Sequence, residues 1–531
     1  MTSPTSSGLA SSEHALDLPR DYNAATWFID RHLKQGRGDK VAYIDADGAT
    51  TYGQLADKVN RAGNMLKSLG LHMEDRVAMI TLDTVDFPTV FWGAIKAGIV
   101  PIPLNTLLTT GDYNYMLSDS RARVLVISEE LFDKVEPILA DLPLLEKIVI
   151  SGKTGFGHPL LSDLLAQAEP KLKPAETTRD DVAFWLYSSG STGAPKGALH
   201  LQRDLPATAV HYGQQVLGIQ ENDITFSAAK LFFAYGLGNG MTFSLHVGAT
   251  TVLLKDRPTP EAVMKILKDH QPTIFYGVPT LYGSILASSE YKRSTASEAL
   301  RVCVSAGEAL PEDVGKRWEE RFGAAILDGL GSTEMLHIFL SNRHGEVRYG
   351  TSGKAVPGYE LKIIADDGHE VPQGEMGELI VCGPSSAVAY WNQREKSLKT
   401  FRGEWTHTGD KYYVDDEGYY RYAGRGDDML KVGGIWVSPF EVEAALISHE
   451  MVLEAAVVGE ADSEGLIKPK AFVVLAPGES GSEVLAEELQ KYVKTKLAPY
   501  KYPRWIEFVD ALPKTATGKI QRFKLRGGMR M

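Results

Sequence analysis

The sequence has few cysteines and lacks an uninterrupted apolar run that could cross a membrane. Its two cysteines among 531 residues, Cys303 and Cys382, cannot form a disulfide framework and do not show metal-ligand spacing. We expect both to be small core residues in a reducing compartment. The apolar stretch 90–104 is interrupted by Lys96 and by glycines and prolines, which argues against a transmembrane helix.

The sequence also shows no pattern typical of a secretory leader and no excess of basic residues. Residues 1–19 are rich in Ser, Thr and Ala but contain no basic segment followed by an apolar core, so we expect a cytoplasmic protein. The chain has 56 Lys and Arg against 68 Asp and Glu, a formal net charge of −12. This balance argues against nucleic acid or an anionic membrane as a partner. A chain of 531 residues predicts one large and one smaller domain.

Helical and strand-like segments alternate along the chain up to residue 328. Apolar residues recur at helical spacing in 51–69, a strand-like run follows at 76–81, and a helix is expected at 86–97. Further apolar runs continue the alternation at 99–103, 124–128, 147–150, 250–254, 273–276, 301–305 and 325–328. The pattern predicts parallel sheets covered by helices, which is the α/β class.

The remaining chain has a different pattern. Strands with glycine turns, such as 359–364, 377–381 and 418–422, predict a β-rich unit after about residue 340. From about residue 427 a separate alternation of strands and helices predicts a small α+β domain, with helices at 439–448 and 482–496 and strands at 455–459 and 470–475. We place the domain boundary at 424–427.

The segment YSSGSTGAPKG at 187–197 is the most informative motif. An apolar strand-like run enters a loop of glycines and hydroxyl residues, and Lys196 follows it. Glycines let backbone N–H groups face an anion, hydroxyls add donors, and a lysine supplies positive charge. An ordinary Ser/Gly-rich surface loop would not require Lys196 between Pro195 and Gly197. The motif therefore predicts phosphate binding.

Two other readings of such loops are excluded by spacing. No Gly-Lys-Ser/Thr stands at the distance from an earlier glycine that a Walker A loop needs. The near match at 152–154 has Lys147 in place of the first glycine, so we predict a surface turn there. Ser189 and Ser191 lack the preceding glycine of a hydrolase nucleophile motif.

Three further motifs follow the phosphate loop: DGLGSTE at 328–334, THTGD at 406–410 with GR at 424–425, and PKTATGK at 513–519. In order and spacing the four resemble the acyl-adenylate-forming superfamily of acyl-CoA synthetases, luciferase and peptide-synthetase adenylation domains. The resemblance covers about residues 25–525. It implies a large N-terminal domain (1–424) of two α/β subdomains plus a β-rich subdomain, a hinge (425–427), and a small mobile α+β C-terminal domain (428–531).

The resemblance also implies the activity of an ATP-dependent acid–CoA ligase. Mg²⁺ with ATP and CoA as co-substrate are the small molecules expected, in a monomer or homodimer. No carrier domain follows Met531, so we expect free CoA as the thiol. A luciferase-like oxygenase and a catalytically silent nucleotide-binding protein are the alternatives from other classes.

The resemblance assigns roles to individual residues. Those expected around ATP are Ser188, Ser189, Gly190, Ser191, Thr192, Gly193, Lys196, Ala306, Gly307, Glu308, Asp328, Gly329, Gly331, Ser332, Thr333, Asp410, Arg425 and Lys519. The catalytic set is Lys519, Glu334, Thr192 and Lys431, in which Glu334 would hold Mg²⁺ and Lys519 would reach the α-phosphate and the attacking carboxylate. Asp427 is the expected hinge residue, and Gly433 and Gly434 would let the pantetheine arm of CoA pass close to the backbone.

The acid is expected beside Phe233, Ala234, Tyr235, Gly236, Gly329, His337 and Ile338. In amino-acid-activating members an Asp anchors the substrate ammonium near position 234, so Ala234 disfavours an amino acid. Aromatic and apolar walls suit a flat ring. The stretch 230–239 resembles benzoate–CoA ligases, which implies benzoate; a hydroxy-, amino- or halobenzoate and a short aliphatic acid are the alternatives. His337 would contact either a ring substituent or its own neighbours.

Overall fold

The computed structural model describes residues 16–188, 194–426, 428–432, 435–462, 466–514 and 520–526, with backbone only at 431, 435 and 436. The first part of the chain builds a four-stranded parallel sheet in the order β4-β3-β5-β6. Its strands are β3 (Arg76–Ile80), β4 (Val100–Pro103), β5 (Val124–Ser128) and β6 (Lys147–Ser151).

Helices cover both faces of this sheet because the side chains of β3 alternate in direction. Val77 and Met79 pack in the cluster that contains α2 (Tyr52–Ser68) and α3 (Asp86–Lys96). Ala78 and Ile80 pack in the cluster that contains α4 (Thr110–Ser120). A capping box between Thr51 and Gln54 fixes the start of α2, which supplies donors to its otherwise unpaired first turn. The expected helices at 51–69 and 86–97 are thus confirmed.

A second, nine-stranded sheet has the order β15-β14-β13-β12-β11-β9-β10-β1-β2. Its parallel centre consists of β9 (Ile224–Ser227), β10 (Thr250–Val252), β11 (Ile274–Gly277), β12 (Val302–Ser305) and β13 (Ile326–Gly331). The two edges are β1 (Val41–Asp45) with β2 (Gly48–Thr51), and β14 (Ile338–Ser341) with β15 (Lys354–Ala355). One face is covered by α9 (Pro260–His270), α10 (Pro279–Leu286) and α11 (Glu312–Phe322). Parallel strands end at the same edge, and loops at that edge form binding sites.

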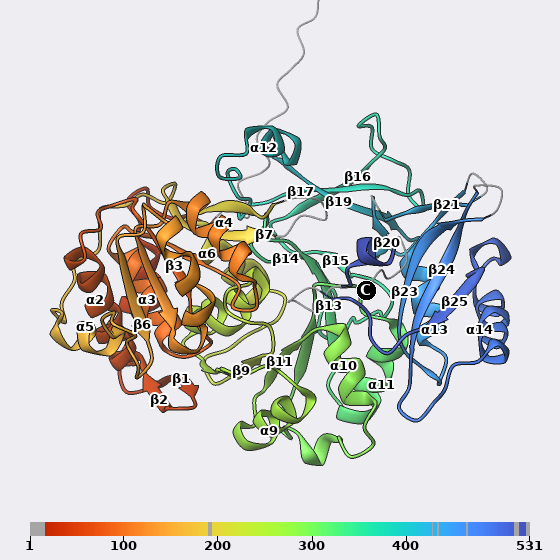
Figure 1. The fold of residues 1–531 in the computed structure, drawn as a ribbon, viewed down its shortest axis with the longest axis horizontal. Coiled ribbons are helices and arrows are strands. Elements are labelled where there is room, and N and C mark those ends of the chain that lie inside the picture. Colours follow the sequence, from red (N-terminus) through yellow and green to blue (C-terminus); the bar gives the residue numbers. More distant parts are fainter. Residues whose placement is uncertain are drawn as a thin grey trace, which may run out of the picture.

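A β-rich unit follows, with the antiparallel strands β16 (Glu360–Ile364), β17 (Gly377–Cys382), β18 (Phe401–Arg402), β19 (Trp405–Val414) and β20 (Tyr420–Arg425). The smaller C-terminal part, blue in Figure 1, lies beside α10 and contacts it through β23 (Val452–Ala461). It contains β21 (Leu430–Val432), β22 (Ile435–Val437), α13 (Pro439–Ile447), β23, β24 (Ile467–Leu475), α14 (Glu483–Lys496), β25 (Trp505–Phe508) and α15 (Arg522–Leu525). The predicted α/β class with a β-rich unit and a smaller α+β part is confirmed. The boundary at 424–427 and the mobility of the small domain remain predictions.

Two local expectations need correction. The strand predicted at 418–422 begins only at Tyr420, because Gly418 has φ +82° and its N–H closes a turn on the Asp415 carbonyl. The strand predicted at 325–328 continues to Gly331, because β14 returns antiparallel and pairs Gly329 with Ser341. Cys303 is buried as expected, whereas Cys382 is only partly buried. Among the residues described, no helix has both the length and the apolar character of a membrane span.

Buried histidines predict a loss of stability in mild acid. The indole N–H of Trp27, which can only donate, lies 3.1 Å from His246 Nδ1, so this nitrogen is unprotonated. Burial lowers the pKa of His246 to about 4 and that of His32 to about 4. Histidines in the unfolded chain have a pKa of about 6.5. Below that pH they bind protons that His246 and His32 do not bind in the folded chain, so these two residues lower the free energy of unfolding.

These histidines should therefore lower the midpoint of thermal unfolding when the pH falls from 7.5 to 5, whereas buried carboxyl groups with a raised pKa, such as Asp328, act in the opposite sense. His246→Asn removes one of these groups while Asn can still accept from Trp27, so its midpoint should drop less over the same interval. Equal drops in the variant and the unaltered protein would contradict the assignment.

Candidate active site

The strands on either side of the phosphate loop form a hairpin. In the antiparallel pair β7 (Val182–Ser188) and β8 (Lys196–Leu201), Ser188 stands directly opposite Lys196. The Lys196 ammonium donates to the Tyr390 hydroxyl at 3.2 Å and lies 4.4 Å from the centre of that ring. Burial lowers its pKa below the ordinary value for lysine. A negatively charged group beside this lysine would stabilise its charged form.

Glu334 lies where three parts of the chain meet. Its Oε1 accepts from the Tyr390 hydroxyl at 2.7 Å and from Ser188 Oγ at 3.3 Å. Lys196 Nζ is 4.0 Å away. Ser188 belongs to the phosphate-loop hairpin, Glu334 to the DGLGSTE motif, and Tyr390 to the segment that follows β17. Sequence patterns did not indicate Tyr390, because its proximity to Glu334 depends on the packing of distant segments.

The segments expected around adenine lie at the carboxyl ends of two neighbouring strands. Ser305 at the end of β12 pairs in register with Asp328 of β13, and Ala306, Gly307 and Glu308 follow directly. Gly307 has φ +95°, a conformation that favours glycine. Asp328 is buried, which raises its pKa well above the ordinary value, and its Oδ1 has no hydrogen-bond partner among the described residues.

Close packing explains both glycines of the DGLGSTE motif. A Cβ on Gly329 would lie 2.9 Å from Ile338 Cγ2, and one on Gly331 would lie 2.7 Å from the His337 carbonyl oxygen. The two glycines therefore let β14 return against β13. Ser332 Oγ accepts from the Met335 N–H at 3.2 Å, which closes the turn that presents Glu334.

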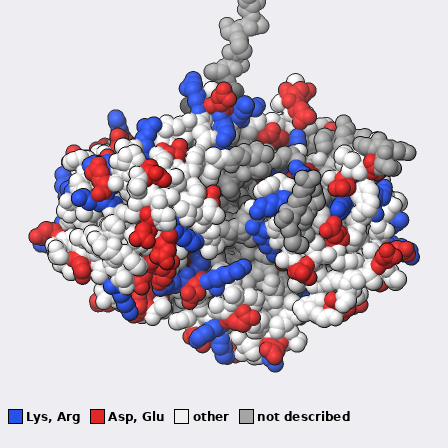
Figure 2. Space-filling view, in the orientation of Figure 1, with Lys and Arg blue, Asp and Glu red and all other residues white. Residues whose placement is uncertain are grey.

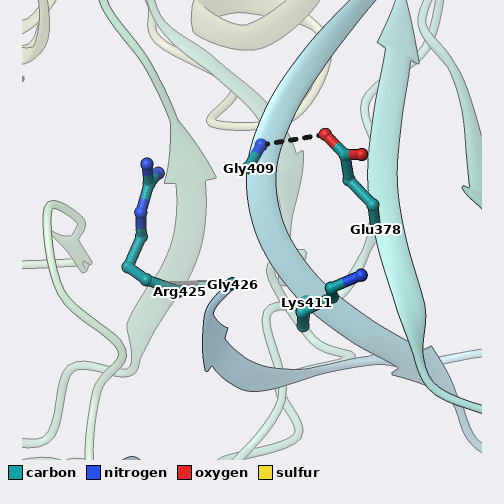
Figure 3. A pocket seen from close by; sticks show the side chains of 5 residues that line it. All are labelled: Glu378, Gly409, Lys411, Arg425 and Gly426. Atoms are coloured by element: carbon teal, nitrogen blue, oxygen red, sulfur yellow. Dashed lines mark hydrogen bonds between the residues drawn. The ribbon is translucent and has the colours of Figure 1, made fainter. Parts of the chain in front are cut away.

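The expected ribose pair is formed by facing residues of β19 and β20. Asp410 stands opposite Arg425, and Arg425 Nη1 donates to Asp410 Oδ1 and to the Thr408 carbonyl, both at 3.1 Å. A cavity of about 280 Å³ adjoins them, lined by Glu378, Gly409, Lys411, Arg425 and Gly426. Figure 3 shows Arg425 and Glu378 on opposite sides of Gly409, whose N–H donates to Glu378.

The small C-terminal part contacts the adenine segment. The Ile520 N–H donates to Glu308 Oε1 at 3.0 Å, so the residue after Lys519 lies beside the loop that follows β12. On the face drawn in Figure 2, Lys and Arg side chains gather beside a central hollow. Cations around such a hollow favour a phosphorylated ligand.

The expected acid-binding segment starts at Phe233 and continues into α7 (Ala234–Leu237). The Tyr235 hydroxyl donates to the carbonyls of Gly277 and Val304, both at 3.1 Å, at the ends of β11 and β12. A Cβ on Gly236 would lie 1.9 Å from the Lys230 carbonyl oxygen. The segment is thus held close to the sheet edge, and the tyrosine hydroxyl is turned to the backbone.

His337 faces its neighbours through one nitrogen. Its Nε2 lies 3.2 Å from the Tyr235 carbonyl and 3.1 Å from Asn239 Oδ1. The Phe243 ring meets it edge-on at 4.5 Å, and burial lowers its pKa to about 3. The Tyr235 carbonyl can only accept, so Nε2 carries the proton. Nδ1 is then a bare acceptor without a partner in the described part of the chain. Asn239 and Phe243 were not indicated by the sequence.

Several predicted residues lie outside the described ranges: Ser189, Gly190, Ser191, Thr192, Gly193, Asp427, Gly433, Gly434 and Lys519. Lys431 belongs to β21, where its backbone pairs with Trp436. The roles of all these residues stay predictions. The near match at 152–154 lies in an exposed bend, as expected. The N–H groups of Lys153 and Thr154 there already donate to the chain's own Glu129.

Two family models match the chain. One, described as AMP-binding enzyme, covers residues 29–391, and one described as AMP-binding enzyme C-terminal domain covers residues 441–519. A benzoate–CoA ligase of Thauera aromatica is 61% identical over 96% of this chain and 97% of its own length. A 4-hydroxybenzoate–CoA/benzoate–CoA ligase of Rhodopseudomonas palustris is 52% identical over 96% of this chain and 94% of its own length.

Solved structures agree with these relatives. A benzoate CoA ligase from Burkholderia xenovorans LB400 superposes with a TM-score of 0.89 at 52% identity, covering 95% of this chain and 100% of its own. An anthranilate CoA ligase in complex with anthranoyl-AMP superposes with a TM-score of 0.94 at 46% identity, covering 97% and 98%.

Tyr390→Phe tests the anchor of Glu334. The change removes the hydrogen bond to Glu334 and also the one accepted from Lys196; a hydrogen bond to a charged group is worth about 1.5–3 kcal/mol, so KM for Mg–ATP should rise roughly tenfold or more. Tyr349→Phe is the matched control, because the Tyr349 hydroxyl also donates to a glutamate, Glu319 Oε2, at 2.8 Å. The control should leave KM for Mg–ATP unchanged. Equal effects of the two changes on steady-state kinetics would rule out a special role for Tyr390.

Proposed function

Because this chain belongs to the AMP-binding enzyme family, we propose that it is an AMP-forming benzoate–CoA ligase. Its reaction converts benzoate, ATP and CoA into benzoyl-CoA, AMP and diphosphate through benzoyl-adenylate. One observation of the structure carries this proposal. The aromatic segment that begins at Phe233 contacts the ends of β11 and β12 through the Tyr235 hydroxyl and contacts His337, three residues after Glu334, which supports an acid site beside the DGLGSTE motif.

The first half-reaction joins two anions. A carboxylate oxygen of benzoate attacks the α-phosphorus of ATP, a new O–P bond forms, and the bond to the bridging oxygen breaks so that diphosphate leaves. Like charges repel, so the site must present cations where negative charge develops. In this proposal Lys196 contacts the outgoing phosphates and Lys519 reaches the α-phosphate and the attacking carboxylate.

Mg²⁺ belongs to this step as part of the Mg–ATP substrate. A carboxylate oxygen is a ligand of the kind that Mg²⁺ takes, and the ion keeps several waters and substrate oxygens as its other ligands. Glu334 fits this need because Tyr390 and Ser188 both donate to a single oxygen, Oε1. We assign Glu334 to the ion and Asp410 to the ribose hydroxyls.

The second half-reaction transfers the acyl group to CoA. The thiolate attacks the carbonyl carbon of benzoyl-adenylate, and AMP leaves with the former carboxylate oxygen. A thiol of ordinary pKa, about 8.5, is partly ionised near neutral pH, so no dedicated strong base is needed. We assign Asp427 to the hinge, Lys431 to the second conformation, and Gly433 with Gly434 to the passage of the pantetheine arm.

The proposed choice of acid follows from the absence of a charged or available hydrogen-bonding group among Ala234, the Tyr235 hydroxyl and the Nε2 of His337. Ala234 carries no charge that could hold an ammonium group, the Tyr235 hydroxyl is engaged with backbone carbonyls, and buried His337 stays neutral. An unsubstituted ring brings no polar substituent of its own that these side chains would have to pair, whereas a buried unpaired polar group costs about 1–3 kcal/mol.

Comparing aromatic acids by their kcat/KM for CoA-thioester formation tests the proposal. Benzoate should exceed 4-hydroxybenzoate, 2-aminobenzoate and butyrate, each measured with Mg–ATP and CoA held at saturation. A higher value for one of the substituted benzoates would transfer the assignment to that acid. Adenylate formation without thioester formation would instead indicate an isolated adenylation activity.

Ala234→Leu tests where the ring lies. Overpacking a closed apolar site typically costs about 1–3 kcal/mol, so kcat/KM for benzoate should fall by roughly tenfold to a hundredfold. The KM for ATP should change little, because the nucleotide is held by other groups, and a smaller acid should lose less than benzoate. Unchanged benzoate kinetics would place the pocket elsewhere.

A further inference from the structure

A buried histidine connects the strand after the phosphate loop to the DGLGSTE motif. His200 lies on β8, and its Nε2 is 2.8 Å from the Thr333 carbonyl oxygen. Its Nδ1 is 3.0 Å from Asp204 Oδ2. The side chains of His200 and Asp204 are 0% and 1% exposed, and the Phe184 ring stacks on the imidazole at 5.2 Å. No motif of the sequence had indicated this pair.

Hydrogen-bond chemistry fixes the proton on one side of the imidazole. A carbonyl oxygen can only accept, so His200 Nε2 must carry a hydrogen toward Thr333. Asp204 Oδ2 also accepts from the Leu201 N–H at 2.9 Å, and burial raises the Asp204 pKa above its ordinary value. Whether the shared proton lies on Nδ1 or on the carboxyl group, the pair is neutral overall and the donor to Thr333 is the same.

The contact holds the backbone next to Glu334. The Thr333 carbonyl belongs to the peptide group that leads into Glu334, and the Glu334 carbonyl itself accepts from the Ala387 N–H at 2.8 Å. The backbone is therefore held on both sides of this residue. The Glu334 side chain accepts hydrogen bonds from Tyr390 and Ser188. His200 adds a contact to the backbone beside it from β8, the strand that begins at Lys196.

We propose that His200, oriented by Asp204, is a positioning residue that sets the Glu334 carboxylate in register with the phosphate-loop strand. The inference rests on the proposed function only in taking Glu334 as the Mg–ATP ligand. His200 does not touch the reactants; it acts through the Thr333 peptide. A shift of about 1 Å in a group that positions the reacting atoms can cost roughly a hundredfold in rate.

Two substitutions distinguish the hydrogen bond of His200 to Thr333 from its hydrogen bond to Asp204. In His200→Gln the amide nitrogen falls near the place of Nε2 and can still donate to Thr333. In His200→Asn the amide nitrogen falls near the place of Nδ1 and can reach only Asp204. Both variants remove the ring and leave one buried group unpaired, so their thermal midpoints should fall by similar amounts.

Titration calorimetry with Mg–ATP, in the absence of any acid, gives the decisive comparison. His200→Gln should bind Mg–ATP within about threefold of the unaltered protein, and His200→Asn should bind at least tenfold more weakly. The same order should appear in KM for Mg–ATP, with KM for benzoate unaffected. Equal affinities for the two variants, or the reverse order, would overturn the proposal.

If His200→Asn does not fold, Asp204 offers a second comparison. In Asp204→Asn an amide nitrogen at the place of Oδ2 can donate to Nδ1 while Nε2 still donates to Thr333, so Mg–ATP binding should be preserved even though the Leu201 N–H loses its acceptor and the thermal midpoint falls. Asp204→Ala leaves the imidazole without its orienting partner and should weaken Mg–ATP binding several-fold. Equal binding by these two variants would also overturn the proposal. Because calorimetry needs no acid, a failure of benzoate as substrate would remain distinguishable from a failure of this positioning role.

Discussion

The proposed nucleotide site depends on how one carboxylate, that of Glu334, is held. Lys196 is 4.0 Å from it, which is too far for a hydrogen bond, whereas the Tyr390 hydroxyl is at 2.7 Å. The tyrosine accepts from the lysine and donates to the glutamate. It therefore bridges the two members of this loose ion pair by hydrogen bonds. Ser188 and the backbone contacts of Thr333 and Glu334 complete this arrangement.

The two α/β sheets explain why such contacts can exist. The carboxyl ends of β11, β12 and β13 meet at one edge, and the Tyr235 hydroxyl fastens the acid segment to that edge through Gly277 and Val304. The glycines at 329 and 331 bring β14 close enough to place His337 against Tyr235. The segments proposed for the acid and the nucleotide thus share one sheet edge, and the small C-terminal part approaches it through the contact between Ile520 and Glu308.

The sequence predicted the elements better than the contacts. Local periodicity identified the α/β alternation, and four motifs identified the acyl-adenylate-forming family, which the matching family models and relatives confirm. Tyr390, Asn239 and His200 could not be predicted, because each acts through a partner far away in the sequence. His337 had two interpretations, and the structure shows that Nε2 serves its neighbours. The strand start at Tyr420 was missed because a turn conformation at Gly418 decides it.

The path of one oxygen atom tests the central claim, that the carboxylate attacks the α-phosphorus of ATP. Benzoate labelled with ¹⁸O in both carboxylate oxygens is converted in the presence of Mg–ATP and CoA, and the products are analysed by mass spectrometry. An adenylate intermediate predicts that one labelled oxygen remains in benzoyl-CoA and the other appears in the phosphate group of AMP. Unlabelled AMP, or label in inorganic phosphate accompanied by ADP, would contradict attack at the α-phosphorus.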